Sequence, residues 1–241
     1  MKPIALTLFC LLSFFLETCS HSTAPPSGIT LVPFTADSGT AALWHFDEAA
    51  GIYVEDASSH HNTGSVIGAT VTAGQFGNAR EFDSTSTYIS VPSAPSLNMD
   101  TSSFTINVWF KTTGQPAGML VRKGVSPVPG YHVNLSFGRV AGLIGDQQFG
   151  PYPDTTILIL SDHIYSDNQW HCATFIRDRT VRQLLLYVDG VSAATPVDDV
   201  FNLSLDNDRP LTIGRWENTS YPWFYKGAID EVRIQRGVVK P

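Results

Sequence analysis

A carboxylate near the C-terminal end of the chain is the first group that could do chemistry. In the segment Tyr225–Gly237, YKGAIDEVRIQRG, strand periodicity is expected to place Asp230 on the same face as Val232 and Ile234. If that face is the core, Asp230 needs a cation, an arginine or several N–H donors, because an unpaired buried charge costs much free energy. A salt bridge and a metal ion both meet this need, and the segment alone leaves both open.

A second candidate is the aromatic run Arg215–Tyr225, RWENTSYPWFY. Flat aromatic rings stack on the apolar faces of sugars, and Arg215, Glu217 and Asn218 could add hydrogen bonds. The predicted ligand-binding residues are Trp216, Tyr221 and Trp223. The alternative is a loop that folds its rings over the edge of the protein, and Tyr225 is expected in the core.

Composition excludes one class of partner. The 241 residues carry a net charge of -7, without a basic patch in the sequence, so nucleic acid is not an expected partner. The length suits one domain with a sizeable core. After residues 1–20, no segment is long and apolar enough to span a bilayer.

The N-terminal end is read as an export signal. Residues 1–20, MKPIALTLFCLLSFFLETCS, have one Lys followed by an apolar run, as secretory signals do. Cleavage after Ser20 would release a secreted protein. Alternatively, Leu16-Glu17-Thr18-Cys19 resembles a lipobox, in which Cys19 would be lipidated and would anchor the protein to a membrane. Residues 21–40, rich in Ser, Thr, Pro and Gly, are predicted to be a flexible linker.

The rest of the chain is expected to form short strands. Phe104–Lys111 is the clearest, with Phe104, Ile106, Val108 and Phe110 facing inward. Trp109 falls on the polar face, where a neighbouring loop covers it or, alternatively, it is available as a binding platform. Asp189-Gly190 predicts a type I′ hairpin turn. Frequent strands, turn residues and no convincing helix together predict an all-β sandwich of two antiparallel sheets over residues 41–239.

Several ordered segments give this region a family resemblance. They are LWHFDE (Leu43–Glu48), DASSHHNTG (Asp56–Gly64), FGNAREFD (Phe76–Asp83), SFTINVWFK (Ser103–Lys111), QWHCATFIRD (Gln169–Asp178), LLLYVDG (Leu184–Gly190) and KGAIDEVRI (Lys226–Ile234). In this order they resemble a laminin-G-like domain of the concanavalin A-like superfamily. The resemblance implies a jelly-roll fold.

The resemblance also bears on Asp230. Members of the family often hold one structural calcium ion between the loop after the first strand and the aspartate of the terminal Ile-Asp-Glu segment. The corresponding positions here are Asp47, Asp56, Asn62 and Asp230. Carboxylate and amide oxygens are ligands that Ca²⁺ prefers.

Catalysis is not expected. Some sandwiches of this superfamily are glycanases that carry Glu-x-Asp-x-x-Glu on one strand, and this chain has no such motif. Asp230 and Glu231 are adjacent, so strand alternation would send them to opposite faces. We therefore expect a non-catalytic, secreted or surface-tethered module that binds carbohydrate or cell-surface glycan. A protein–protein adhesion domain is the alternative, and a glycan hydrolase or lyase is disfavoured.

Overall fold

The computed structural model describes residues 31–114, 117–125, 128–145, 156–202, 204–216 and 223–241. Within these ranges the regular structure is β-strand apart from one 3-10 helix, η1 (Pro95–Leu97). None of the helical structure described there is long and apolar enough to cross a membrane.

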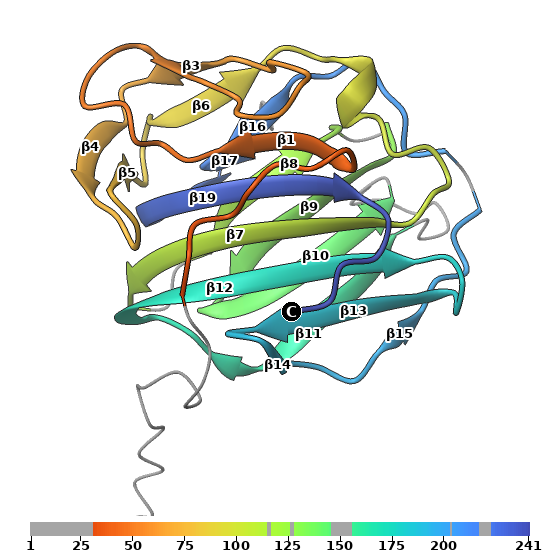
Figure 1. Ribbon diagram of the computed structural model, residues 1–241. Coiled ribbons are helices and arrows are strands. Elements are labelled where there is room, and N and C mark those ends of the chain that lie inside the picture. Colours follow the sequence, from red (N-terminus) through yellow and green to blue (C-terminus); the bar gives the residue numbers. More distant parts are fainter. Residues whose placement is uncertain (1–30, 115–116, 126–127, 146–155, 203, 217–222) are drawn as a thin grey trace, which may run out of the picture.

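The described strands form two antiparallel sheets that pack face to face (Figure 1). Sheet A contains β1 (Thr40–Trp44), β4 (Thr70–Ala73), β5 (Asn78–Asp83), β7 (Phe104–Thr113), β12 (Asp167–Asp178), β13 (Gln183–Val188), β14 (Val191–Ser192), β15 (Val197–Asp198) and β19 (Lys226–Arg236). Sheet B contains β2 (Tyr53–Val54), β3 (Gly64–Ile67), β6 (Tyr88–Val91), β8 (Gly118–Lys123), β9 (Gly130–Ser136), β10 (Arg139–Gly145), β11 (Ile157–Ile164) and β16 (Leu211–Ile213). A separate ribbon consists of β17 (Arg215–Trp216) and β18 (Trp223–Phe224). The predicted all-β sandwich is confirmed.

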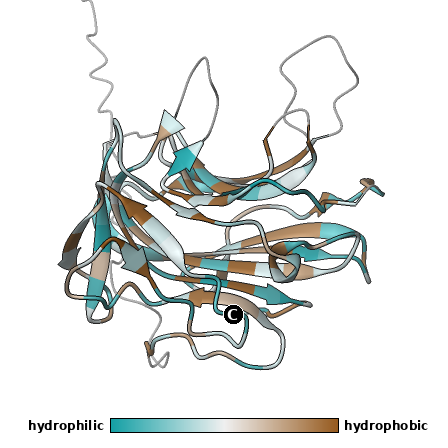
Figure 2. Cartoon of the chain, turned by 90° about the horizontal axis from the view of Figure 1, so that it is seen from above, coloured by the Kyte–Doolittle hydropathy of each residue, from teal (hydrophilic) through white to brown (hydrophobic). Residues whose placement is uncertain are grey.

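The core lies between the two sheets. Along β7, Phe104, Ile106 and Phe110 are fully buried in it, as the alternation predicts. In Figure 2, brown hydrophobic stretches alternate with teal hydrophilic ones along strands of both layers. Trp109 points outward from sheet A, where the ring of Phe76 packs edge-on against it at 5.8 Å between centroids. Trp109 is thus covered by a neighbouring loop, as expected.

A β-bulge in β19 changes the predicted orientation of its carboxylates. The pairing of β19 with β7 shifts register between Asp230 and Arg233, and Glu231 has a φ of 47°. Ile229 and Val232 both lie in the core, so the two acidic residues between them lie on the outer side of the sheet. The expectation that Asp230 shares a face with Val232 is therefore wrong. The expectation that Asp230 and Glu231 point to opposite faces is wrong for the same reason.

The bulge occurs where β19 changes neighbour. The first half of the strand pairs with β5, up to Ile229 with Arg80, and the second half pairs with β1, from Val232 with Trp44. Along one edge, β19 thus pairs first with β5 and then with β1. The bulge in the pairing with β7, on the other edge of β19, lies between these two paired segments.

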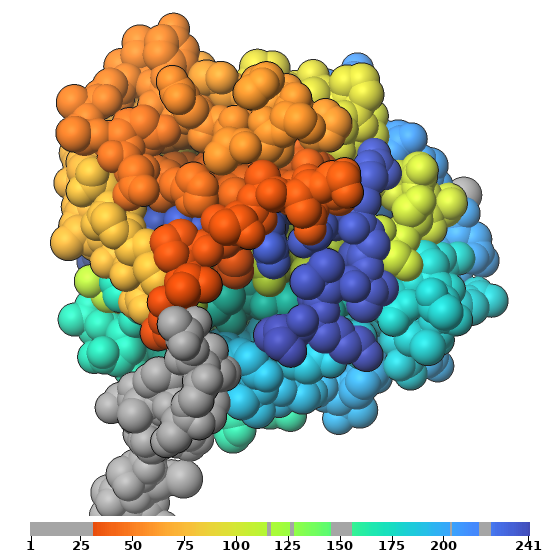
Figure 3. Space-filling view, viewed as in Figure 1, coloured from red at the N-terminus to blue at the C-terminus, as the bar shows by residue number. Residues whose placement is uncertain are grey.

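The end of the predicted linker is attached to sheet A. The backbone N–H of Phe34 donates to Glu231 Oε2 at 2.9 Å, and the Arg233 guanidinium lies 4.4 Å from the centre of the Phe34 ring. Figure 3 shows this N-terminal part of the chain lying beside the C-terminal strand on one face of the molecule. Residues 1–30, with the predicted signal and Cys19, lie outside the described residues.

Candidate functional site

The ribbon of β17 and β18 carries the aromatic segment selected from the sequence. The chain enters it at Gly214, where φ is +84° and an added Cβ would lie 2.4 Å from the Phe82 ring, so a larger residue would be strained. The chain leaves it at Tyr225, a buried residue whose N–H donates to the Gly214 carbonyl at 2.8 Å. The Tyr225 hydroxyl donates to the Lys111 carbonyl at 2.9 Å. Both ends of the ribbon are therefore fixed to the sandwich.

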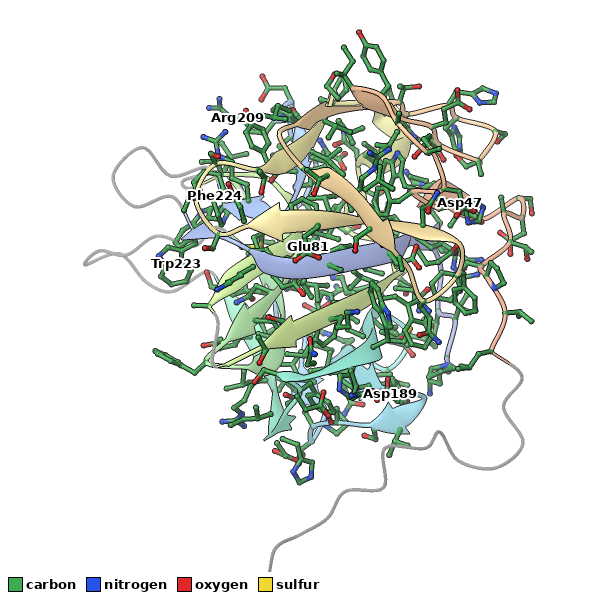
Figure 4. The ribbon with its side chains drawn as sticks, turned by 90° about the vertical axis from the view of Figure 1, so that its left-hand side faces the viewer. Asp47, Glu81, Asp189, Arg209, Trp223 and Phe224 are labelled. Carbon is green, nitrogen blue, oxygen red and sulfur yellow. The ribbon has the colours of Figure 1, made fainter. Side chains whose placement is uncertain are left out.

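The two faces of the ribbon carry different side chains. Arg215 pairs with Phe224 across the strands, and Trp216 pairs with Trp223. Cross-strand partners share a face, whereas consecutive residues face opposite ways, so the two pairs occupy opposite faces. Figure 4 shows Trp223 and Phe224 on the side of the molecule away from Asp47.

On one face, a buried tryptophan supports an exposed one. The rings of Trp216 and Trp223 meet edge to face, with centroids 4.7 Å apart and planes at 80°. Trp216 is only 3% exposed, while Trp223 is 41% exposed. The Arg122 guanidinium, from β8, lies 5.0 Å from the centre of the Trp216 ring. An exposed indole held in this way is a preorganised surface for stacking.

On the other face, an arginine lies beside two neighbouring rings, those of Tyr88 and Phe224, whose centroids are 6.5 Å apart. The Arg215 guanidinium carbon is 4.5 Å from the centre of the Tyr88 ring and 5.6 Å from that of Phe224. The backbone carbonyl of Arg215 accepts a hydrogen bond from Thr212 Oγ1 at 2.8 Å. Arg215 Nε is buried without a hydrogen-bond partner in the described part of the chain.

Beneath the ribbon, polar side chains cross the outer face of sheet B. Arg122 is paired with His132 on one side and with Thr212 on the other, and all three are buried. Burial, and then the positive charge of Arg122, hold the pKa of His132 well below its usual range. His132 is therefore neutral at physiological pH.

The structure separates the predicted ligand-binding residues. Trp223 is exposed and Trp216 is buried behind it, while Tyr221 lies outside the described residues. Sequence reasoning missed Tyr88 and Arg122. Strand alternation could have placed both on an outer face, but their closeness to the ribbon follows from the pairing of β6 and β8 with β16.

Two of the predicted metal ligands form an internal hydrogen-bond network. Asp56 Oδ1 accepts the N–H groups of Leu43 and Ser58, each at 2.8 Å. Asp56 Oδ2 accepts the Asn62 N–H and the Asn62 side-chain amide, also at 2.8 Å. Asn62 Oδ1 accepts the Ser96 hydroxyl at 3.1 Å. Both oxygens of Asp56 are thus engaged in holding the first long loop against β1.

The other two predicted ligands, Asp47 and Asp230, accept hydrogen bonds from the backbone of a single turn, residues 74–78. Asp47 Oδ1 accepts the Asn78 N–H at 2.9 Å, and Asp230 Oδ2 accepts the Phe76 N–H at 3.0 Å. Burial raises the pKa of Asp230 to about 7; the Phe76 N–H opposes this rise, and the charge of Glu231 adds to it. Asp230 Oδ1 is buried and has no hydrogen-bond partner among the described residues.

The four predicted ligands therefore form two pairs. Across the described ranges, no three His, Cys, Asp or Glu side chains are arranged to hold a metal ion. In the pair Asp47 and Asp230, the buried Oδ1 of Asp230 accepts no hydrogen bond from the described residues. A carboxylate oxygen of this kind suits a hard cation such as Ca²⁺. Asp56 and Asn62 have no comparable free oxygen among their described contacts.

Comparisons with known proteins agree with the fold. The family described as the concanavalin A-like lectin/glucanases superfamily (Laminin_G_3) matches residues 83–241. No curated protein sequence matches the chain.

Solved structures with this fold include binding domains. The binding domain of Paraclostridial Mosquitocidal Protein 1 is 17% identical with a TM-score of 0.66, over 84% of this chain and 50% of that one. The botulinum neurotoxin serotype G binding domain is 15% identical with a TM-score of 0.63, over 83% and 48%. This chain thus spans about half the length of these toxin domains.

One similar structure is matched over nearly its whole length. Domain 4 of AbnA, an extracellular arabinanase from Geobacillus stearothermophilus, was solved in complex with arabinotriose. It is 17% identical with a TM-score of 0.62, over 84% of this chain and 95% of that one. Identities at this level establish a shared fold and nothing finer.

Proposed function

Because this chain belongs to the concanavalin A-like lectin/glucanases superfamily, we propose that it is a non-catalytic module that binds carbohydrate through the ribbon of β17 and β18. The observation that carries the proposal is the exposed indole of Trp223, held edge to face by buried Trp216. The apolar face of a sugar ring stacks on such an indole with little loss of side-chain entropy, because the indole is already held in place.

The comparisons support this proposal at the level of fold. Arabinotriose bound to the arabinanase domain is an instance of a sandwich of this shape in complex with an oligosaccharide. The toxin binding domains are matched over only about half of their length, so they are a weaker guide to this chain.

The carboxylates of β19 do not offer a hydrolytic pair. Asp230 and Glu231 lie on the same outer side, but Asp230 is 0% exposed and Glu231 is 1% exposed. Asp230 receives the Phe76 N–H, and Glu231 receives the Phe34 N–H. A sugar could not reach either group without displacing these contacts, so the proposed module binds its glycan without cleaving it.

Calcium is part of the proposal as a structural ion. Asp47 and Asp230 would hold it, with backbone carbonyl oxygens completing a coordination shell of the kind that Ca²⁺ takes. The bound ion would supply the positive charge that the buried Asp230 carboxylate lacks. Since Trp223 lies on the other side of the molecule from Asp47, the ion would stabilise the domain without touching the glycan (Figure 4).

We also propose that the module acts outside the cytoplasm. Residues 1–20 would direct export, and either cleavage after Ser20 or lipidation of Cys19 would follow. A lipid at Cys19 would tether the sandwich to a membrane through the segment that ends at Phe34 on sheet A.

A glycan array tests the function. Purified protein is applied with calcium and with chelator, as wild type, Trp223→Ala and Trp170→Ala. Trp170 is the matched control, because it is half-buried on the outer face of sheet A, with Lys111 Nζ 5.2 Å from its ring centre. We expect wild type and Trp170→Ala to bind the same glycans and Trp223→Ala to lose them. Wild-type protein that binds no glycan would refute the proposal.

A further inference from the structure

We propose that His171 is a pH-sensitive clamp: its protonated ring ties the start of β12, residues 167–169, to the hairpin of β13 and β14, and loss of the proton releases residues 167–169. In Figure 4, Asp189 of that hairpin lies well away from Trp223. The clamp shares no residue with the ribbon of β17 and β18, so this inference does not depend on the proposed glycan-binding function.

Both nitrogens of the His171 ring face carboxylates. Nδ1 lies 2.7 Å from Asp189 Oδ2, and Nε2 lies 3.1 Å from Asp167 Oδ1. An ionised carboxylate can only accept hydrogen bonds, and an imidazole carries a proton on both nitrogens only in its cationic form. The two hydrogen bonds are therefore made together only when His171 is protonated.

Aromatic rings pack against the rest of the imidazole. Phe110 of β7 lies with its ring centroid 5.8 Å from that of His171, and Tyr165 of the turn between β11 and β12 meets it edge to face at 5.2 Å. Burial, and then the charge of Asp189, raise the pKa of Tyr165, so its phenol stays neutral. In the described chain, the charged groups that face His171 are thus Asp189 and Asp167, both acidic.

These two carboxylates favour the charged ring. Burial opposes protonation of His171, but the hydrogen bonds and charges of Asp189 and then Asp167 outweigh it and raise the pKa of His171 above its ordinary value of 6.5. The clamp is therefore complete in acid, and it opens as pH rises through this raised pKa.

The contact with Asp167 is the one that opens. Asp189 is fixed to β12, because its Oδ1 accepts the Cys172 N–H at 2.8 Å and its own N–H donates to the Cys172 carbonyl at 3.0 Å. Its bond to His171 is also the shorter of the two. The neutral ring therefore keeps its proton on Nδ1, and the lone pair of Nε2 then faces an oxygen of Asp167, which repels it.

Asp167 lies where β12 departs from regular pairing. The register of β12 with β7 shifts between Asp167 and Trp170, and Asn168 has a φ of 66°. Asp167 Oδ1 also accepts the Gln169 N–H at 2.9 Å, so a single oxygen both organises this segment and binds His171. Repulsion from a neutral ring turns the oxygen away and loosens residues 167–169.

The release is local. The Tyr165 N–H donates to the Gly138 carbonyl at 2.8 Å, and the Ser166 hydroxyl donates to the Gly114 carbonyl. Neither bond involves an ionisable group, so both hold the preceding turn at either end of the pH range.

Nitrogen NMR of the histidine rings tests the clamp directly. The purified chain is titrated from pH 5 to 9, and backbone order parameters of residues 167–169 are measured at both ends of the titration. We expect the His171 ring to titrate above pH 6.5 and to become the tautomer with its proton on Nδ1. Residues 167–169 should lose order as the ring loses its proton.

Variants locate the effect. Asp167→Asn should lower the pKa of His171 and keep residues 167–169 ordered throughout, because an amide N–H can donate to the neutral Nε2. Asp162→Asn removes the same charge from an exposed position on β11, outside the pair of acids that faces the ring, and should behave as the wild type does. His171→Gln should make the order parameters independent of pH. Amide spectra check that each variant is folded.

Three results would overturn the clamp. The first is a wild-type ring that titrates at or below pH 6.5, or that keeps its proton on Nε2 when neutral. The second is equal order of residues 167–169 at both ends of the wild-type titration. The third is a fall in the pKa of His171 that is as large in Asp162→Asn as in Asp167→Asn. If a variant does not fold, the wild-type titration alone decides.

Discussion

Asp230 accepts the backbone N–H of Phe76 at 3.0 Å through Oδ2, while Oδ1 of the same buried carboxylate meets no donor among the described residues. Burial raises the pKa of Asp230 to about 7, from an ordinary value of 3.8. The Phe76 ring also covers Trp109, so the hydrogen bond to Asp230 holds this cover in place. A group that compensates the buried Asp230 carboxylate would stabilise the same turn. A bound cation would do so, and one would stabilise the native state in proportion to the logarithm of its concentration.

The first prediction concerns calcium and Asp230. We expect chelator to lower the melting temperature of the wild type by several degrees, because a native-state ligand at a hundredfold excess over its Kd contributes about 3 kcal/mol. Asp230→Asn should melt at the same temperature with calcium and with chelator. Identical wild-type melts in both conditions, with no ion found by elemental analysis, would show that calcium is not bound.

The raised pKa of Asp230 also predicts how the stability of the metal-free protein depends on pH. The native carboxyl holds its proton up to about pH 7, whereas the unfolded one releases it near 3.8. Between these values the native state binds more protons, so the contribution of Asp230 to stability falls as pH rises through this window. Asp230→Asn should flatten this slope in chelator.

The second prediction concerns Gly77, which lies against the carboxylate of Asp47. A Cβ at Gly77 would lie 2.1 Å from Asp47 Oδ1, and its φ is +52°. Gly77→Ala should therefore cost the strain of a left-handed backbone, about 1 kcal/mol, and also displace Asp47 and weaken calcium binding. Gly114→Ala is the control, because its φ is +85° but nothing lies within 4 Å of an added Cβ. Equal stability losses and equal calcium affinities in the two variants would contradict the role given to Asp47.

The third prediction concerns His132. Its pKa is held well below 6.5 by burial and by Arg122, so below pH 6.5 the unfolded state binds a proton that the native state does not. The contribution of His132 to stability should be present above this pH and lost as pH falls.

Chemical denaturation from pH 5 to 8 measures this effect. The pKa of His45 and that of His171 are raised, so these groups stabilise at low pH and oppose the trend in the wild type. The informative quantity is the difference between wild type and His132→Gln, which should become smaller at low pH. A difference for His132→Gln that stays constant from pH 5 to 8 would refute the assignment.

The fourth prediction concerns the N-terminus. Intact-mass analysis of protein from the native host should find either a diacylglycerol adduct on Cys19 or a free N-terminus directly after Ser20. Both outcomes place the sandwich outside the cytoplasm. Recovery of the uncleaved chain from the cytoplasmic fraction would contradict export.

Strand periodicity predicted most of the fold because successive side chains of a strand point alternately to the core and to the outer face. From Phe104 to Phe110, every second residue of β7 lies in the core between the sheets. The Asp189-Gly190 turn has the two positive φ values, 54° and 78°, that a type I′ turn requires. The rule failed at Glu231, where one extra residue shifts the alternation. Nothing in the local sequence reports this bulge, which lies where the strand beside β19 changes from β5 to β1.

The candidate site was predictable only in part for the same reason. Local sequence identified Trp223 and Arg215, because they lie in one aromatic run. Tyr88 comes from β6, far back in the chain, and reaches Arg215 only through the pairing of β6 with β16. A single sequence does not contain the order of strands in a sheet, so such long-range contacts stay hidden until the fold is known.

The central claim is that sugar stacks on Trp223, and the tryptophan indole N–H resonances test it most directly. The chain has 5 tryptophans, which label the core and both outer faces. On saturation with the array's tightest glycan, we predict the largest shift at Trp223, with Trp44, 0% exposed, and Trp170 unchanged. A largest shift at Trp170, or no change at Trp223 when the glycan is bound, would contradict the account.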